Sequence, residues 1–201
     1  ILFLFTTNFL YLGCSNNETI DENKVNLQNP SFLYSLAMQD LDEEKYDDAN
    51  LKFKDLIYLF PLSNEGIQSQ IMIAFIDYIK MDYVESIYKF NKIIKLYPSH
   101  KNIDYVYYMK AMCYFEQIES ESLDGFNNQK SLMSFKELMN RFPESNYARD
   151  SQQKIIFIKE NIAAKHMNIG RFYLNQKKYL AALNRFNIII NEYSKSKFTP
   201  E

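Results

Sequence analysis

Residues 83–98 read YVESIYKFNKIIKLYP, with a serine, a phenylalanine and a proline at fixed intervals. Ser86 and Phe90 are four residues apart, so on an α-helix they share one face. The small serine lets a neighbouring helix approach closely, and the phenylalanine fills the seam between the two helices. Pro98 lacks a backbone donor and cannot continue a helix. The segment therefore predicts a packed helix that ends just before residue 98.

The same pattern occurs in three further segments. They are YDDANLKFKDLIYLFP from Tyr46, NQKSLMSFKELMNRFP from Asn128 and YLAALNRFNIIINEYS from Tyr179. In all four copies the small residue is Ala49, Ser86, Ser131 or Ala182, and the phenylalanine is Phe53, Phe90, Phe135 or Phe186. Proline closes every copy except the last, which has Ser194 in its place. Such repetition is typical of tetratricopeptide repeats, in which each unit is a helix hairpin.

Each copy needs a preceding partner helix, for which residues 31–44, 64–81, 103–118 and 146–176 are the candidates. The steps between the phenylalanines are 37, 45 and 51 residues, longer than the roughly 34 of an ideal repeat. We therefore predict an all-α domain over residues 31–201, a tetratricopeptide-like right-handed superhelix of antiparallel helix hairpins. A last helix is expected to begin near Thr199, so the repeat domain is interpreted as truncated at its C-terminal end.

The composition argues against several functional classes. Only 4 glycines and 5 prolines occur, which favours helices with short connections over a β-rich fold. The net charge is −2 without a basic stripe, so the electrostatic footprint of a nucleic-acid-binding protein is missing. Two cysteines do not suggest a disulfide framework, and two distant histidines do not form a metal site. Without a Gly-rich phosphate loop or a G-x-S-x-G motif, we predict a non-enzymatic protein with no cofactor or metal.

The N-terminal residues predict export and lipidation. Residues 1–13, ILFLFTTNFLYLG, are uncharged and mostly apolar. They are too short to span a bilayer, which takes about 20 residues, but they have the length of the apolar part of a signal peptide. Cys14 follows Leu12 and Gly13, which resembles a bacterial lipobox, although Tyr11 replaces the usual leucine. The resemblance implies cleavage before Cys14 and its acylation; the alternatives are an ordinary signal peptide or a buried segment.

After this cysteine the chain becomes polar and shows no helical period as far as Pro30. We interpret residues 14–30 as the lipidated cysteine and a flexible tether to the folded body. Ser15 directly follows the cysteine. In lipoproteins of Gram-negative bacteria, a residue other than aspartate at this position usually implies sorting to the outer membrane.

Three segments carry a resemblance to a known family. Residues 96–112, LYPSHKNIDYVYYMKAM, resemble the L-x-P-x-H-x-N-x-D-Y-x-x-Y-x-x-G segment of the BamD/ComL family, lipoproteins of the outer-membrane β-barrel assembly machinery. Residues 141–166 resemble its R-x-P-x-S-x-Y-x-x-D-A segment with the long helix that follows, and residues 179–190 its fourth-repeat helix. The chain departs from the family pattern at Lys101, Ala111 and Ser151, and residues 119–127 lack the Arg-Asp pair that is common there.

The resemblance covers essentially all of residues 14–201 and implies a scaffold, lipid-anchored at the periplasmic face of the outer membrane. It implies binding to the periplasmic domains of a BamA-type barrel-forming subunit, mainly through the C-terminal repeats. Other assembly lipoproteins and unfolded outer-membrane proteins are further implied partners, the latter received by the N-terminal repeats. The alternative function is a generic periplasmic repeat lipoprotein that organises cell-wall or division proteins.

Five residues are the candidates for partner binding. Tyr105, Tyr107 and Tyr108 cluster at the start of one predicted helix and form either inter-repeat packing or a groove for apolar-aromatic peptide. Arg171 and Arg185 lie in the last hairpin and are either solvated or ion-paired across an interface with the assembly subunit. Arg185 is the first choice, because it adjoins the repeat-signature residue Phe186.

Overall fold

The computed structural model describes residues 29–118 and 125–199, and these residues form eight α-helices. The predicted signal segment 1–13, the predicted lipidation site Cys14 and nearly all of the predicted tether lie outside the described residues. The described part of the chain contains no strand.

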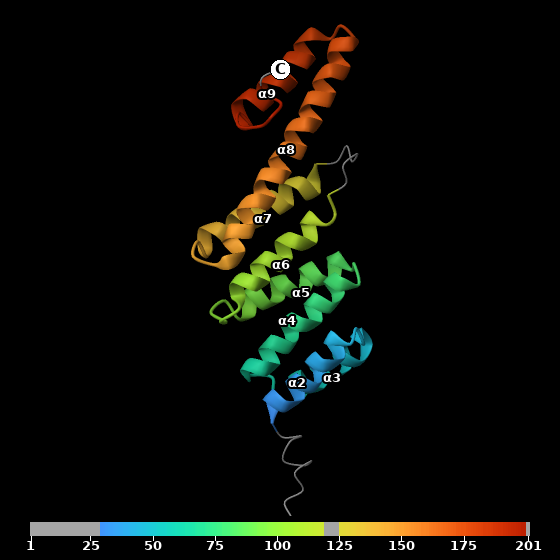
Figure 1. Ribbon diagram of the computed structural model, residues 1–201, viewed down its shortest axis with the longest axis vertical. Coiled ribbons are helices and arrows are strands. Elements are labelled where there is room, and N and C mark those ends of the chain that lie inside the picture. Colours follow the sequence, from blue (N-terminus) through green and yellow to red (C-terminus); the bar gives the residue numbers. More distant parts are fainter. Residues whose placement is uncertain (1–28, 119–124, 200–201) are drawn as a thin grey trace, which may run out of the picture.

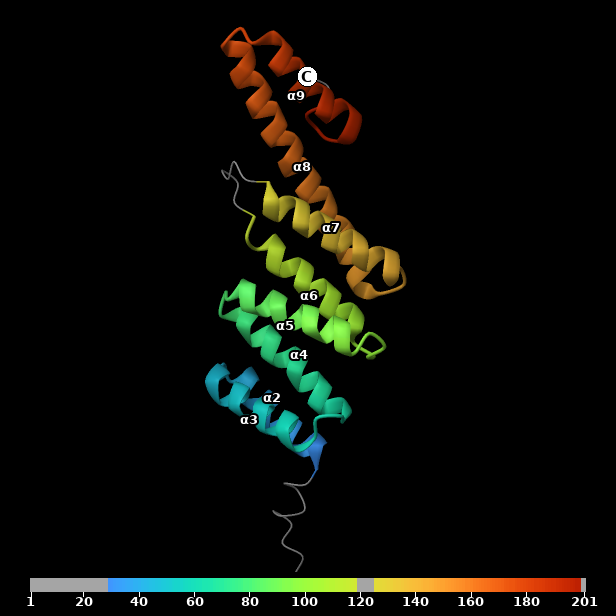
Figure 2. The ribbon, with the colours of Figure 1, turned by 180° about the vertical axis from the view of Figure 1, so that it is seen from behind.

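The helices form four consecutive hairpins, which Figures 1 and 2 show as an elongated stack in chain order. They are α2 (Pro30–Asp42) with α3 (Tyr46–Leu59), α4 (Asn64–Ile79) with α5 (Tyr83–Leu96), α6 (Ile103–Phe115) with α7 (Phe126–Arg141), and α8 (Asn146–Asn175) with α9 (Tyr179–Glu192). Every helix packs against the next one, and the first helices of neighbouring hairpins also touch, α2 on α4, α4 on α6 and α6 on α8. The predicted all-α, tetratricopeptide-like fold is therefore confirmed.

The small-residue and phenylalanine pattern builds the seams between the helices. Phe53, Phe90 and Phe135 are all 0% exposed. The small residues of the pattern and their counterparts on the first helices are also 0% exposed: Ala49, Ser86 and Ser131, with Ala37, Ala74 and Ala111. Ser86 Oγ donates a hydrogen bond to the Ala74 carbonyl oxygen at 2.8 Å, so this buried hydroxyl is satisfied without widening the seam.

In the last hairpin, the seam between the two helices has a glycine in the position of the small residue. A Cβ placed on Gly170 of α8 would lie 2.4 Å from the ring of Phe186, so the bare backbone at this position makes room for the ring. Phe186 is only half-buried, because no later hairpin covers it among the described residues. The outer face of α9 exposes Tyr179, Leu180, Leu183 and Ile190.

The turn inside three of the hairpins has one conformation. Glu44, Met81 and Lys177 each follow the last residues of a first helix with φ values of 59°, 61° and 60°. The backbone N–H of the next residue then reaches back to a carbonyl of the final helical turn, as Lys45 N does to Asp40 O at 2.8 Å. This Schellman-type ending satisfies the terminal carbonyl groups and reverses the chain.

Gly66 provides a stability test of the turn between hairpins. An added Cβ would lie 2.1 Å from the backbone oxygen of Phe60, which cannot move without moving the turn. We expect Gly66→Ala to lower the free energy of unfolding by about 1–3 kcal/mol, measured by urea unfolding followed by helical circular dichroism. The control is Gly125→Ala, whose Cβ would meet only Lys165 Nζ at 3.7 Å. Equal effects of the two substitutions would contradict this reading of the turn.

Candidate partner-binding surfaces

Five aromatic side chains form a continuous row across α4, α6 and α8, and we call them the aromatic row: Phe75, Tyr78, Tyr105, Tyr108 and Tyr147. All five are half-buried. The ring centroids lie 6.5 Å apart between Phe75 and Tyr105, 5.5 Å between Tyr105 and Tyr147, and 5.0 Å between Tyr108 and Tyr147. Because each ring is held by its neighbour on the next helix, the row is fixed in place by the stacking of the hairpins.

Carboxylates orient two hydroxyl groups of the row. Tyr108 donates to Asp150 Oδ2 at 2.7 Å, and Tyr78 donates to Glu116 Oε1 at 3.3 Å. Burial, followed by the charge of Glu116, raises the pKa of Tyr78 to about 12. Burial also raises the pKa of Tyr105, and burial with the Asp150 hydrogen bond raises that of Tyr108. These tyrosines therefore stay neutral near pH 7 and present apolar ring faces with polar edges.

The structure separates the three tyrosines singled out in the sequence. Tyr105 and Tyr108 lie in the aromatic row, whereas Tyr107 is 5% exposed and packs against Phe142 at 5.5 Å. Lys110 Nζ and Arg141 Cζ lie 5.2 and 5.4 Å from the Tyr107 ring centroid. Tyr107 therefore supports the neighbouring turn rather than extending the row.

Sequence reasoning missed Phe75, Tyr78 and Tyr147 as members of the row. The signal was present in part, since Phe75 and Tyr78 are three residues apart, as are Tyr105 and Tyr108. That spacing places both members of a pair on the same helix face. The register between α4, α6 and α8 could not be read from spacing alone, because it depends on how the hairpins stack.

The two candidate arginines lie on the facing helices of the last hairpin. Arg171 is exposed on α8, and Arg185 is partly exposed on α9. His166 stacks on Tyr193 at 6.4 Å, and burial together with the positive charge of Arg185 lowers the pKa of His166. Arg185 therefore lies near His166 of α8, on the side of α9 that faces α8.

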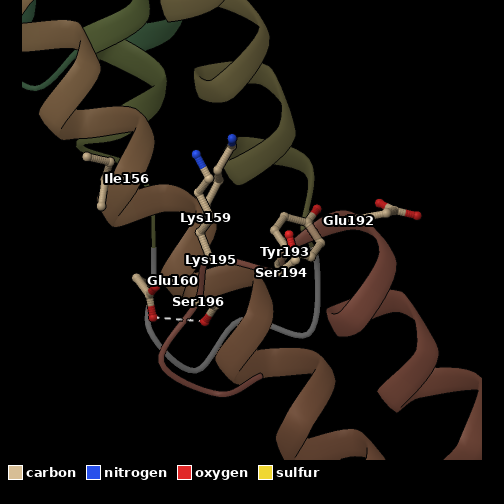
Figure 3. Close-up of a pocket in the computed structure, with 8 residues that line it drawn as sticks. All are labelled: Ile156, Lys159, Glu160, Glu192, Tyr193, Ser194, Lys195 and Ser196. Atoms are coloured by element: carbon tan, nitrogen blue, oxygen red, sulfur yellow. Dashed lines mark hydrogen bonds between the residues drawn. The ribbon is translucent and has the colours of Figure 1, made fainter. Parts of the chain in front are cut away.

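A cavity of about 270 Å³ opens between the middle of α8 and the turn after α9 (Figure 3). Ser196 Oγ donates to Glu160 Oε2 at 3.0 Å, and the backbone N–H of Lys197 donates to Glu160 Oε1 at 3.3 Å. Glu160 thus fastens the turn to α8. Lys159 and Lys195 extend toward the same side of the cavity in Figure 3.

The remaining polar candidates have structural positions. His100 is 9% exposed, and its Nδ1 accepts a hydrogen bond from the Asn102 N–H at 3.3 Å, so it has a structural role in a turn. Cys113 is 0% exposed and belongs to the core. Within residues 29–118 and 125–199, no three His, Cys, Asp or Glu side chains cluster as a metal site. No helix in the same ranges has the length and apolar character needed to cross a bilayer.

Residues 27–201 match the model of the family YfiO, described as an outer membrane lipoprotein. Among curated proteins, the outer membrane protein assembly factor BamD of Rickettsia prowazekii is 35% identical over 80% of this chain and 64% of its own length. The same-named protein of Caulobacter vibrioides is 32% identical, over 85% of this chain and 56% of its own length. That of Neisseria meningitidis is 26% identical over 100% of this chain and 80% of its own length.

The chain thus spans 56% and 64% of the length of the first two of these relatives. A solved structure titled MamA RS-1 ArsTM double mutant is 13% identical and superposes with a TM-score of 0.44, over 85% of this chain and 79% of that one. The fold assignment therefore rests on the hairpins and seams of this chain and not on that superposition.

Proposed function

Because the chain belongs to the YfiO family of outer membrane lipoproteins, we propose that it is a non-enzymatic scaffold of the outer-membrane β-barrel assembly machinery. The resemblance to the BamD/ComL family is confirmed by the family match and by relatives named as assembly factors. The observation that carries the proposal is the stack of hairpins, which offers a rigid aromatic row and a separate apolar helix face. A repeat stack of this kind presents extended surfaces to protein partners.

The proposed site for the barrel-forming subunit is the last hairpin. Its helix α9 exposes Leu180 at 73%, Leu183 at 53% and Tyr179 at 63%, with Arg185 on the same helix. Aromatic side chains and arginine are enriched in protein interfaces, and arginine pairs with carboxylates through two parallel hydrogen bonds. Arg185, with Arg171 on the facing helix, is proposed to pair with acidic groups on the periplasmic domains of a BamA-type subunit.

The proposed site for unfolded outer-membrane proteins is the aromatic row. Transmembrane β-barrels carry girdles of aromatic residues and strands that alternate apolar and polar side chains. The half-buried rings of Tyr105 and Tyr108 offer stacking faces to such segments. The carboxylates of Glu116 and Asp150 keep the hydroxyl groups of Tyr78 and Tyr108 oriented. A partner segment would therefore bind through ring contacts, with main-chain polar groups at the edges.

The proposed attachment is an acyl group on Cys14, which holds the scaffold at the periplasmic face of the outer membrane beside other assembly lipoproteins. A single acyl chain binds a bilayer only marginally, whereas several chains hold a protein stably. The tether would then let the folded body reach partners that sit away from the anchor.

Depletion of this protein in its own bacterium tests the proposed function. We expect the amounts of folded β-barrel proteins in the outer membrane to fall, because substrates and the barrel-forming subunit lose their common scaffold. The measurement is quantitative mass spectrometry of isolated outer membranes, with re-expression of the intact chain as the control. Normal barrel levels combined with a cell-division defect would reject the assembly role and favour an organiser of cell-wall or division proteins.

A further inference from the structure

A lysine-rimmed apolar groove lies between α3 and α5, at the opposite end of the stack from the last hairpin. Its floor contains Ile57, Ile73 and Ile93, and Lys54 and Lys92 stand at its sides. The groove has a volume of about 430 Å³, and no carboxylate is among the residues that line it. The groove therefore has an apolar floor, and all the charged side chains that line it are lysines.

The two large hydrophobic side chains with the highest exposure in the described part of the chain are Leu62, which lines this groove, and Tyr58, which follows the lining residue Ile57. Tyr58 at the end of α3 and Leu62 in the following turn are both 86% exposed. Contiguous exposed apolar groups of this kind mark surfaces that contact a partner or a membrane.

Two of the three lysines that line the groove have no acidic partner among the residues that the structure describes. Lys54 and Lys92 make no ion pair with any residue in the described ranges. Lys89, which also lines the groove, pairs with Asp77 at 2.5 Å. Two unpaired cations beside an apolar rim suit an anionic surface.

The start of the described chain lies at the same turn. Ser31 Oγ, in the first turn of α2, donates to Glu65 Oε1 at the start of α4 at 2.6 Å. Figures 1 and 2 both show the beginning of α2 beside the turn from α3 to α4, which contains Leu62. From Cys14 to Asn29 the chain can span at most about 50 Å, so an anchor at Cys14 would keep this turn within that distance of the bilayer.

We propose that the turn from α3 to α4 and its lysine-rimmed groove dock on an anionic phospholipid bilayer, with Tyr58 and Leu62 inserted at the headgroup level and Lys54 and Lys92 facing lipid phosphates. Tyrosine is favoured at membrane–water interfaces, and each lysine near an anionic surface adds to the attraction. The orientation of the scaffold on the membrane rests on the proposed lipid anchor at Cys14. The attraction of the groove and its turn to an anionic bilayer does not depend on that anchor. The docking would fix which face of the scaffold points to the periplasm.

Vesicle sedimentation tests this proposal on a chain that begins at Ser15 and carries no acyl group. All described core clusters lie beyond residue 29, so this chain keeps the whole core. We expect it to bind vesicles of phosphatidylethanolamine with phosphatidylglycerol, to bind phosphatidylcholine vesicles far more weakly, and to be released by salt. Lys54→Glu with Lys92→Glu should weaken binding at least about tenfold, and Tyr58→Ser with Leu62→Ser should also weaken it.

The matched control is Lys136→Glu with Lys195→Glu, which makes the same change of net charge at exposed lysines elsewhere. Equal loss of binding in the control pair would show attraction by net charge alone and overturn the proposal. Failure of the chain to sediment with anionic vesicles would also overturn the proposal. An acidic protein segment would then be the favoured occupant of the groove. Because acylation plays no part in this assay, its result is independent of whether Cys14 carries a lipid.

Discussion

Replacing Phe90 with alanine is expected to lower the free energy of unfolding by about 3–5 kcal/mol. Phe90 is 0% exposed and belongs to the largest buried cluster, which includes residues from α4, α5, α6, α7 and α8. Removing the ring leaves a cavity at the seam between the second and third hairpins. Since domains of this kind are stable by only about 5–15 kcal/mol, the substitution should unfold a measurable fraction of the protein at growth temperature.

Urea unfolding followed by circular dichroism measures this loss, and Tyr88→Ala on the same helix is the control. Tyr88 is 63% exposed, so its truncation is expected to change the stability by less than about 0.5 kcal/mol. If Phe90→Ala and Tyr88→Ala had the same small effect, the repeat phenylalanines would not be the residues that hold the hairpins together.

Reversing the charge of Arg185 is expected to weaken binding of the barrel-forming subunit by about thirtyfold or more, because breaking a charge pair in an interface costs about 2–5 kcal/mol. Arg185 is partly exposed on α9, so a partner can reach it. The substitution lies outside the buried clusters, so the fold should be kept. The measurement is the dissociation constant of Arg185→Glu for purified periplasmic domains of that subunit.

Two variants sharpen this test. Arg185→Lys keeps the charge but loses the paired hydrogen bonds, so an intermediate affinity is expected. Arg149→Glu reverses an exposed arginine near the start of α8, at the opposite end of that helix from the turn to α9, and should bind normally. Equal weakening by Arg149→Glu would indicate a general electrostatic effect in place of a local contact.

The helices and their seams were predictable because both depend on local spacing. The predicted helices 64–81 and 146–176 correspond to α4 (Asn64–Ile79) and α8 (Asn146–Asn175), which differ by only one or two residues at their ends. The four-residue interval from Ser86 to Phe90 places both side chains in the core, as the helix period requires. Gly170 takes the small position of its helix and meets Phe186 there.

The surfaces were less predictable, because they combine residues from different hairpins. Tyr105, Tyr107 and Tyr108 are neighbours in sequence, but the 100° turn per residue sends Tyr107 to another side of α6. The lysine-rimmed groove joins Lys54 of α3 to Lys92 of α5, two lysines that nothing in the local pattern connects. Phe186 has the same signature as Phe90 yet remains half-buried, since a seam needs helices on both sides to close.

Affinity purification of the chain from detergent-solubilised outer membranes tests the scaffold role most directly. We expect the barrel-forming subunit to be retained with the intact chain and to be lost when Arg185→Glu is used as bait. Recovery of the intact chain alone, from membranes that contain the subunit, would contradict the account.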